Sequence, residues 1–155
     1  IHLLGLGPRR ARTDGPPRTM TSGHLAVTAV KAHVDTWNSM DRARWVALFS
    51  PDVVFEDPVG APPKVGIDAV HKTWDRSFTP GRRWTLHPRQ IVAGGDAEAA
   101  VVMHNVGELG DKRVEVNSVE IFTVGHDGRI ERVRAFFDQP TEFALADWFT
   151  PERSE

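Results

Sequence analysis

The sequence predicts an α+β domain in which helices come first and a curved antiparallel sheet follows. Apolar residues recur at helical spacing before residue 50, whereas long alternating runs separated by glycine-containing turns follow residue 82. Helices that precede a run of antiparallel strands pack together on one face of the sheet. A chain of 155 residues, of which 40% are hydrophobic and 26% charged, suffices for one such domain, which we place at residues 21–150.

The overall composition excludes several classes of protein. The formal net charge is -2 and there is no dense basic block, so we expect no nucleic acid partner. No apolar run approaches the ~18 residues of a membrane span. Cysteine is absent, which removes disulfides, thiolate nucleophiles and zinc–thiolate sites and favours the cytoplasm. The histidines are scattered without metal-ligand spacing, so we expect neither a metal nor another cofactor.

Residues 1–20 differ from the rest of the chain. They are rich in arginine, proline and glycine, and their few leucines come before the basic residues rather than after them. A secretory signal has the opposite order, and repeated proline does not sustain a helix. We therefore expect residues 1–20 to be a disordered extension, with a basic docking arm as the alternative, and residues 151–155 to be a short tail.

The first half of the domain is predicted to be mainly helical. Its first helix has an apolar face that includes His33, and Asp41 is suited to cap the second helix. We expect helices at Ser22–Met40, Arg42–Phe49 and Ile67–Phe78, a strand at Val53–Glu56, and loops at Ser50–Asp52 and Gly60–Gly66.

The second half of the domain is predicted to be a strand meander. Alternating side chains and glycine turns indicate strands at Arg83–Ala93, Ala97–Gly107, Arg113–Val124 and Arg129–Phe137. The segment Pro140–Phe149 is either a short closing helix or a tail.

Asp57 is the first candidate for chemistry, because it is a carboxylate at an apolar position. Side chains alternate along a strand, so Val53, Phe55 and Asp57 share one face. Loss of solvent there would raise the pKa of the carboxyl toward values useful for a general base. The alternative is an Asp-Pro turn residue that bonds its own backbone.

Glu120 is the second candidate, in the row that also contains Val116, Ser118 and Phe122. A buried glutamic acid there would be neutral and able to donate a hydrogen bond to an oxyanion. The alternative is a solvated face, with Val119 and its neighbour Ile121 in the core instead.

His33 is the third candidate, since it lies in the apolar stripe of the first helix. It is either a core histidine or a group that donates to a substrate oxygen. Weaker candidates are His104, Asn105 and Asn117, because strands carry many such residues on solvated faces.

The chain contains Trp-Asn-Ser-Met-Asp at 37–41 and Glu-Asp-Pro-Val-Gly at 56–60. Together these motifs resemble ketosteroid isomerase and, more broadly, the SnoaL-like branch of the NTF2-like superfamily. The most specific is the Glu56–Gly60 block, Glu-Asp-Pro-Val-Gly, at its distance from the Trp-Asn-Ser-Met-Asp segment at 37–41. The similarity continues through Asp127–Ile130 and Arg134–Phe137 and covers roughly residues 24–138. It implies a conical barrel with a deep apolar pocket, usually paired as a homodimer.

The resemblance also implies roles for the three candidate residues. The catalytic base of the family falls on Asp57, and the protonated acid that donates to the oxyanion falls on Glu120. The oxyanion tyrosine of the family falls on His33, and the chain contains no tyrosine that could supply the phenol from another position. We expect the pocket wall to contain Phe55, Trp37, Val101, Met103, Val116, Ser118, Phe122 and Phe137.

Three functions are compatible with this pattern. The first is an allylic isomerase with Asp57 as base and with His33 and protonated Glu120 as donors to the dienolate oxygen. The second is a polyketide cyclase or an epoxide hydrolase that uses the same acid and base. The third is a binding module without catalysis, since fold alone does not determine function. Each of them implies a hydrophobic small-molecule partner, either a steroid or a polyketide-like compound.

Overall fold

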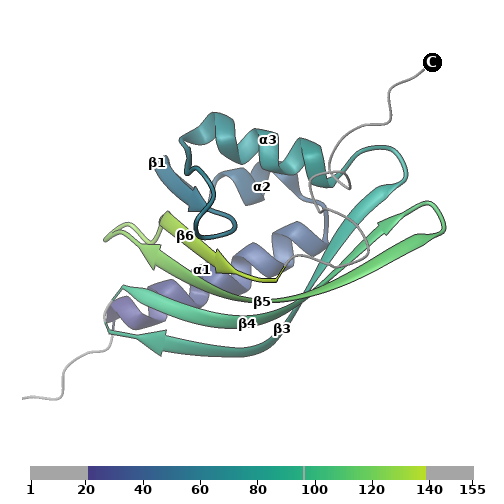
Figure 1. Cartoon of the computed structure of the whole chain (residues 1–155). Helices are drawn as coiled ribbons and strands as arrows, with labels where there is room; N and C mark the ends of the chain where they lie inside the picture. Colours follow the sequence, from purple (N-terminus) through teal and green to yellow (C-terminus); the bar gives the residue numbers. More distant parts are fainter. Residues whose placement is uncertain (1–20, 96, 139–155) are drawn as a thin grey trace, which may run out of the picture.

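The computed structural model describes residues 21–95 and 97–138, and its helices and long strands follow the expected order (Figure 1). The elements are α1 (Thr21–Asn38), α2 (Arg42–Val46), β1 (Phe49–Glu56), β2 (Lys64–Val65), α3 (Ile67–Ser77), β3 (Arg82–Gly94), β4 (Glu98–Leu109), β5 (Lys112–Val124) and β6 (Ile130–Phe136). The predicted α+β class is confirmed. The extension expected at 1–20, the closing helix at 140–149 and the tail at 151–155 lie outside the described residues. No helix in the described ranges is long and apolar enough to cross a membrane.

The strands form one curved sheet in the order β2-β1-β6-β5-β4-β3 (Figure 1). The strands β3 to β6 are antiparallel neighbours, as predicted. However, β1 runs parallel to β6, with Phe55 opposite Val133, so the expectation of an entirely antiparallel sheet is wrong at this pair. Alternation along a strand reveals which face a residue takes but not the direction of the neighbouring strand. The sheet of the described residues ends in β2 and β3, and it is not closed into a barrel.

α1 packs against β3, β4 and β5 on the concave side of the sheet (Figure 1). The predicted apolar face of α1 is buried except for His33, which is only partly buried. The buried residues of this face are Ala26, Ala29, Val30, Val34 and Trp37. The opposite face is exposed, so the periodicity of the sequence predicts the orientation of this helix correctly.

The end of α1 is fixed to the backbone of β3 by two side chains. The indole N–H of Trp37 donates to the carbonyl of Trp84 over 3.0 Å. The side-chain amide of Asn38 donates to the carbonyl of Leu86 over 2.8 Å, and its oxygen accepts from the Leu86 N–H over 2.9 Å. β3 lies at one end of the strand order, so these bonds join the helix to an edge of the sheet.

The junction between α2 and β1 lies earlier than the sequence predicts. α2 ends at Val46 and β1 already begins at Phe49, so the turn expected at 50–52 belongs to the strand. Pairing with β6 explains the difference, because the Ile130 N–H donates to the Leu48 carbonyl over 2.8 Å. Pro51 is tolerated in β1 because the register with β6 is interrupted after Phe49.

The loop expected at Gly60–Gly66 also contains paired backbone. Lys64 in β2 lies opposite Phe55 in β1, which makes this segment an antiparallel edge of the sheet. A strand of two residues is too short to produce an alternating pattern in the sequence.

An aromatic cluster joins the three helices to β1. Asp41 caps α2 as predicted, since its carboxylate accepts from the Arg44 backbone N–H over 3.2 Å. The helix then buries Trp45, whose ring centroid lies 5.0 Å from that of Trp37, 4.8 Å from that of Phe49 and 5.4 Å from that of Trp74. Edge and tilted contacts at these separations stabilise the packing beyond simple burial.

Gly107 provides the space that Trp84 occupies across the β3–β4 pair. A Cβ at this position would lie 2.8 Å from the Trp84 ring, which is closer than two carbons approach. We expect Gly107→Ala to lower the free energy of unfolding by about 1–3 kcal/mol because the ring must shift within a packed core. Urea denaturation measures this change. Gly94→Ala is the matched control, since its added Cβ would be no closer than 3.9 Å to other atoms; equal stability of the two variants would contradict the prediction.

Candidate active site

A cavity of about 700 Å³ opens between the helices and the concave face of the sheet. This volume falls in the range of sites for small organic ligands. Much of its wall is apolar, and six of the residues expected to form it do so: Trp37, Phe55, Val116, Ser118, Phe122 and Phe137. The three candidate residues for chemistry, Asp57, Glu120 and His33, line the same cavity.

Two residues expected in the wall belong to the core instead. Val101 and Met103 have no exposed surface and are absent from the cavity lining. They lie on the α1 side of β4, where the helix covers them completely. The strand alternation correctly predicts their face, but it does not show which part of that face the helix covers.

The wall also contains residues that the sequence did not single out. Trp45 and Phe49 come from the α2–β1 region, and Trp84 comes from β3. Lys64 and Arg76 add two cationic side chains from β2 and α3. Only the tertiary fold brings these segments together, and we find no local signal that would have identified them.

Asp57 follows β1 and presents its carboxyl to the cavity. Asp57 is exposed to solvent through the open cavity, although neighbouring protein atoms partly desolvate its carboxyl. Burial raises the pKa of Asp57, and the positive charge of Lys64 partly opposes this change. When ionised, the carboxylate is therefore a stronger base than a fully solvated aspartate.

Glu56, the neighbouring carboxylate, has different surroundings. Its side chain accepts hydrogen bonds from Arg134 over 2.8 Å and from Arg132 over 3.0 Å. Burial acts to raise the pKa of Glu56, but the bonds and charges of the two arginines together lower it. Glu56 is not part of the cavity wall, so of these adjacent acids only Asp57 faces the site.

Glu120 lies on the cavity side of β5. Ser118 is only 4% exposed whereas Val119 is 44% exposed, so the alternative of a solvated Glu120 face is wrong. Burial and, to a smaller extent, the charge of Asp57 raise the pKa of Glu120, and a hydrogen bond from Ser118 acts in the opposite direction; together they give a pKa of about 7. Near neutral pH a large fraction of Glu120 is therefore protonated.

A directional chain of hydrogen bonds leads to Glu120. The Asn105 Nδ2 amide donates to the Ser118 hydroxyl oxygen over 2.9 Å and to the Val116 carbonyl over 3.0 Å. The Ser118 hydroxyl in turn donates to Glu120 Oε1 over 3.0 Å. Oε1 is thus an acceptor, which leaves Oε2 as the oxygen that carries the proton of the neutral acid.

His33 reaches the cavity from α1. Its Nδ1 accepts a hydrogen bond from the indole N–H of Trp45 over 2.9 Å, and its ring centroid lies 5.3 Å from that of Phe122. Burial lowers the pKa of His33 to about 4, so the imidazole is neutral at physiological pH. His33 is therefore a neutral polar group in the wall, rather than a core residue sealed from the cavity.

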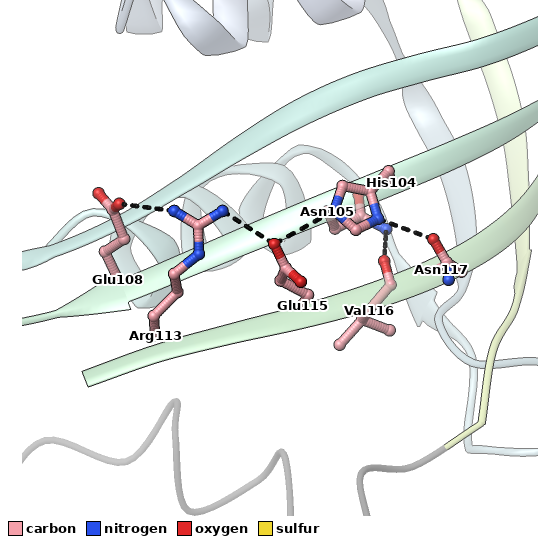
Figure 2. Close-up of polar contacts among 7 residues, drawn as sticks. All are labelled: His104, Asn105, Glu108, Arg113, Glu115, Val116 and Asn117. Carbon is pink, nitrogen blue, oxygen red and sulfur yellow. Dashed lines mark hydrogen bonds and ion pairs between the residues drawn. The ribbon is translucent and has the colours of Figure 1, made fainter.

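The weaker candidates divide between the two faces of the sheet. Asn105 lines the cavity, whereas His104 and Asn117 do not. The side chains of His104 and Asn117 form a hydrogen bond with each other over 2.8 Å. His104 also contacts Glu115, which pairs with Arg113, so these residues form a polar row along β4 and β5 (Figure 2). This row lies on the outer face, because Asn117 alternates with the cavity residues Val116 and Ser118.

The comparison with known families agrees with this architecture. A model of the SnoaL-like domain matches residues 30–133. The chain belongs to the SnoaL-like domain family. The resemblance inferred from the sequence motifs is thereby confirmed.

Individual relatives of this SnoaL-like chain include enzymes. It is 29% identical over 109 residues to the Steroid Delta-isomerase of Nocardioides simplex. The matched region covers 70% of this chain and 86% of that protein. Its fold is similar to that of Δ5-3-ketosteroid isomerase from Mycobacterium sp., with a TM-score of 0.66, 20% identity, and coverage of 74% of this chain and 93% of that chain. It is also similar to the epoxide hydrolase/cyclase-like enzyme SalBIII of salinomycin pyran ring formation, with a TM-score of 0.66, 25% identity, and coverage of 72% and 89%.

The SnoaL-like cavity thus offers three kinds of polar group to a bound apolar molecule. Asp57 supplies a carboxyl of raised pKa beside Lys64, Glu120 a carboxyl that carries a proton near neutral pH, and His33 a neutral imidazole. A base and two neutral hydrogen-bond groups in a partly desolvated site are suited to proton transfer at carbon or to acid–base opening of a ring.

The protonation of Glu120 makes stability depend on pH. Its pKa is about 7 in the folded chain against an ordinary 4.5, so folding is favoured by proton binding. This contribution is fully present below pH 4.5 and is lost as the pH rises through 7. As the pH rises from 5 to 8, we expect the wild type to lose about 1–3 kcal/mol of unfolding free energy relative to Glu120→Gln. Chemical denaturation of both proteins across this range measures the difference.

Glu115→Gln on the outer face is the control for this prediction. The hydrogen bond from Arg113 lowers the pKa of Glu115, so Glu115→Gln should differ from the wild type by a constant amount between pH 5 and pH 8, and a pH-dependent difference should arise only below about pH 4.5. A Glu120→Gln protein whose stability follows that of the wild type at every pH would contradict the protonation of Glu120.

Proposed function

We propose that this SnoaL-like protein is an isomerase that moves the double bond of a β,γ-unsaturated ketone into conjugation. One observation carries the proposal: Asp57 and Glu120 line the same apolar cavity, and the charge of Asp57 helps to raise the pKa of Glu120. The likeness to a Steroid Delta-isomerase supports a steroid or a similarly polycyclic ketone as the substrate. The aromatic wall and the volume of about 700 Å³ are compatible with a hydrophobic molecule of that size.

The reaction requires one base and a site for the developing negative charge. The Asp57 carboxylate removes a proton from the carbon between the carbonyl and the double bond. The electron pair of that C–H bond forms a new double bond, and the carbonyl oxygen becomes a dienolate oxygen. Hydrogen bonds from protonated Glu120 and from neutral His33 stabilise this oxygen. Asp57 then returns the same proton to the γ carbon, so the product is an isomer and no cofactor is consumed.

A second candidate function is the opening of an epoxide, with hydrolysis or ring closure. It is favoured by the absence of a tyrosine at the His33 position and by the likeness to SalBIII. Asp57 would take a proton from the attacking water or substrate hydroxyl, and Glu120 would give its proton to the epoxide oxygen as the C–O bond breaks. Turnover of an apolar cyclic epoxide that requires both Asp57 and Glu120 would favour this function over isomerisation.

The base is tested by Asp57→Asn, assayed with a β,γ-unsaturated 3-ketosteroid by the appearance of the conjugated enone. We expect kcat to fall by at least about 10²-fold, because the variant retains the shape of the carboxyl but cannot accept the proton. Glu56→Gln is the matched control, because this neighbouring carboxylate lies outside the cavity wall, and we expect it to retain turnover within about threefold.

The outcomes of this assay separate the candidate functions. Undiminished turnover by folded Asp57→Asn would exclude Asp57 as the base. A folded wild type that binds the steroid without turning it over would exclude the isomerase and leave epoxide opening, or binding without catalysis.

We further propose that the protein pairs with a second copy through the outer face of the sheet. Val102, Val119 and Phe136 are 39%, 44% and 41% exposed, and Val119 lies opposite both of the others in the strand register. The polar row of Figure 2 adjoins them on the same face and contains both signs of charge. Val102, Val119 and Phe136 form an apolar row on this face. Two copies can therefore bury this row against each other while their oppositely charged side chains pair beside it.

The pairing is tested by Val119→Asp, which places a charge in the centre of the apolar row. We expect a dimer for the wild type and a monomer for this variant in size-exclusion chromatography with light scattering. Val65→Asp, at a residue that is 62% exposed in β2, is the control and should remain dimeric. A monomeric wild type at micromolar concentration would rule out this interface.

A further inference from the structure

We infer that Trp45 is a positioning residue, which holds the neutral His33 ring with its proton on Nε2 so that His33 offers an N–H donor to the cavity. This inference deepens the proposed isomerase function. It rests on that function only for the role of the N–H donor in catalysis, whereas the position of the proton on the His33 ring follows from the geometry alone. It concerns the position where the chain departs from the pattern that the resemblance implies, since His33 falls on the expected tyrosine.

The Trp45–His33 hydrogen bond determines where the proton lies. The indole N–H of Trp45 is a donor without a lone pair to accept, and it lies 2.9 Å from His33 Nδ1. His33 Nδ1 must therefore present its lone pair to Trp45. A neutral imidazole carries one N–H, so the proton lies on Nε2, the nitrogen that remains available for another partner.

The same bond opposes a charged imidazole. Protonation of Nδ1 would place two N–H donors against each other at 2.9 Å and would remove the hydrogen bond. The titratable or charged side chains that share the cavity with His33 in the described ranges are Asp57, Glu120, Lys64 and Arg76. The ring therefore stays a neutral donor, rather than a cation that would bind the Asp57 carboxylate and reduce its basicity.

Trp45 is immobilised well enough to impose this geometry. It is 1% exposed, and its ring contacts those of Trp37, Phe49 and Trp74 at centroid separations between 4.8 and 5.4 Å. The short helix α2, which Asp41 caps, carries it. A donor fixed in this way does not need to reorganise when negative charge develops on the substrate oxygen, and such preorganisation is the main source of oxyanion stabilisation.

The state of the ring is tested by ¹⁵N NMR of the imidazole nitrogens at pH 7.5, without substrate. We expect the wild type to show the Nε2–H tautomer of His33 alone, with a coupling across the hydrogen bond from Trp45. Trp45→Phe keeps a ring in the cluster but removes the N–H, and we expect a mixture of both tautomers. Trp74→Phe is the matched control, because it replaces another indole of the same cluster with a smaller ring, and Trp74 lies outside the cavity wall. We expect this variant to keep the single tautomer of His33.

Isomerase kinetics on the same proteins test the use of the donor. We expect kcat of Trp45→Phe to fall about 10- to 100-fold with KM changed less than threefold, because an oriented donor acts mainly on the transition state. We expect kcat of Trp74→Phe to stay within threefold of the wild type. A fall in both variants alike would indicate only disturbed packing and would overturn the positioning role.

The failures of the two proposals are distinguishable. A wild type with the Nε2–H tautomer but no isomerase turnover would refute the proposed reaction and leave the Trp45–His33 inference standing. Nδ1–H or mixed tautomers in the wild type would overturn the inference whatever the activity, and this measurement does not depend on a variant that must fold.

Discussion

Partial desolvation of the polar side chains that line the cavity is the constraint on which the candidate site depends. The helices cover the concave face of the sheet without filling the space above it, and aromatic rings line much of the remaining volume. In this environment burial raises the pKa of Asp57 and Glu120 and lowers that of His33. The carboxylates Glu56 and Glu115 lie outside the cavity, where arginine partners lower their pKa instead. Similar carboxylic acids therefore differ in protonation because the fold divides them between two environments.

Much of this arrangement could be predicted from local patterns. The helical period placed the buried face of α1 correctly, and the period of two placed Glu120 and Ser118 on one face of β5 but left open whether that face was the inner one. The same period placed Asp57 on the face of Val53 and Phe55, although an Asp-Pro turn residue stayed open as the alternative. These predictions succeed because they depend on a side chain's direction from its own element, which spacing along the chain determines.

What could not be predicted depends on neighbours that are distant in the sequence. Alternation does not reveal that β1 runs parallel to β6, or that this pairing draws Phe49 out of the preceding helix. It does not distinguish Val101, which α1 covers, from Val116, which reaches the cavity. The bond from Trp45 to His33 joins two helices, and nothing in either segment indicates it. The directions of side chains were therefore predictable, whereas their partners were not.

The two hydrogen bonds between the Asn38 side chain and the Leu86 backbone also affect the tendency of this chain to aggregate. The Asn38 amide makes both bonds that a neighbouring strand would make with one residue, and it makes them at an edge of the sheet. A free edge invites further strands to add to the sheet, which is a common route to aggregation. Asn38 occupies the backbone groups of Leu86 that an added strand would need, so part of this edge is already blocked. A residue at the end of a helix thus contributes to solubility as well as to the attachment of that helix.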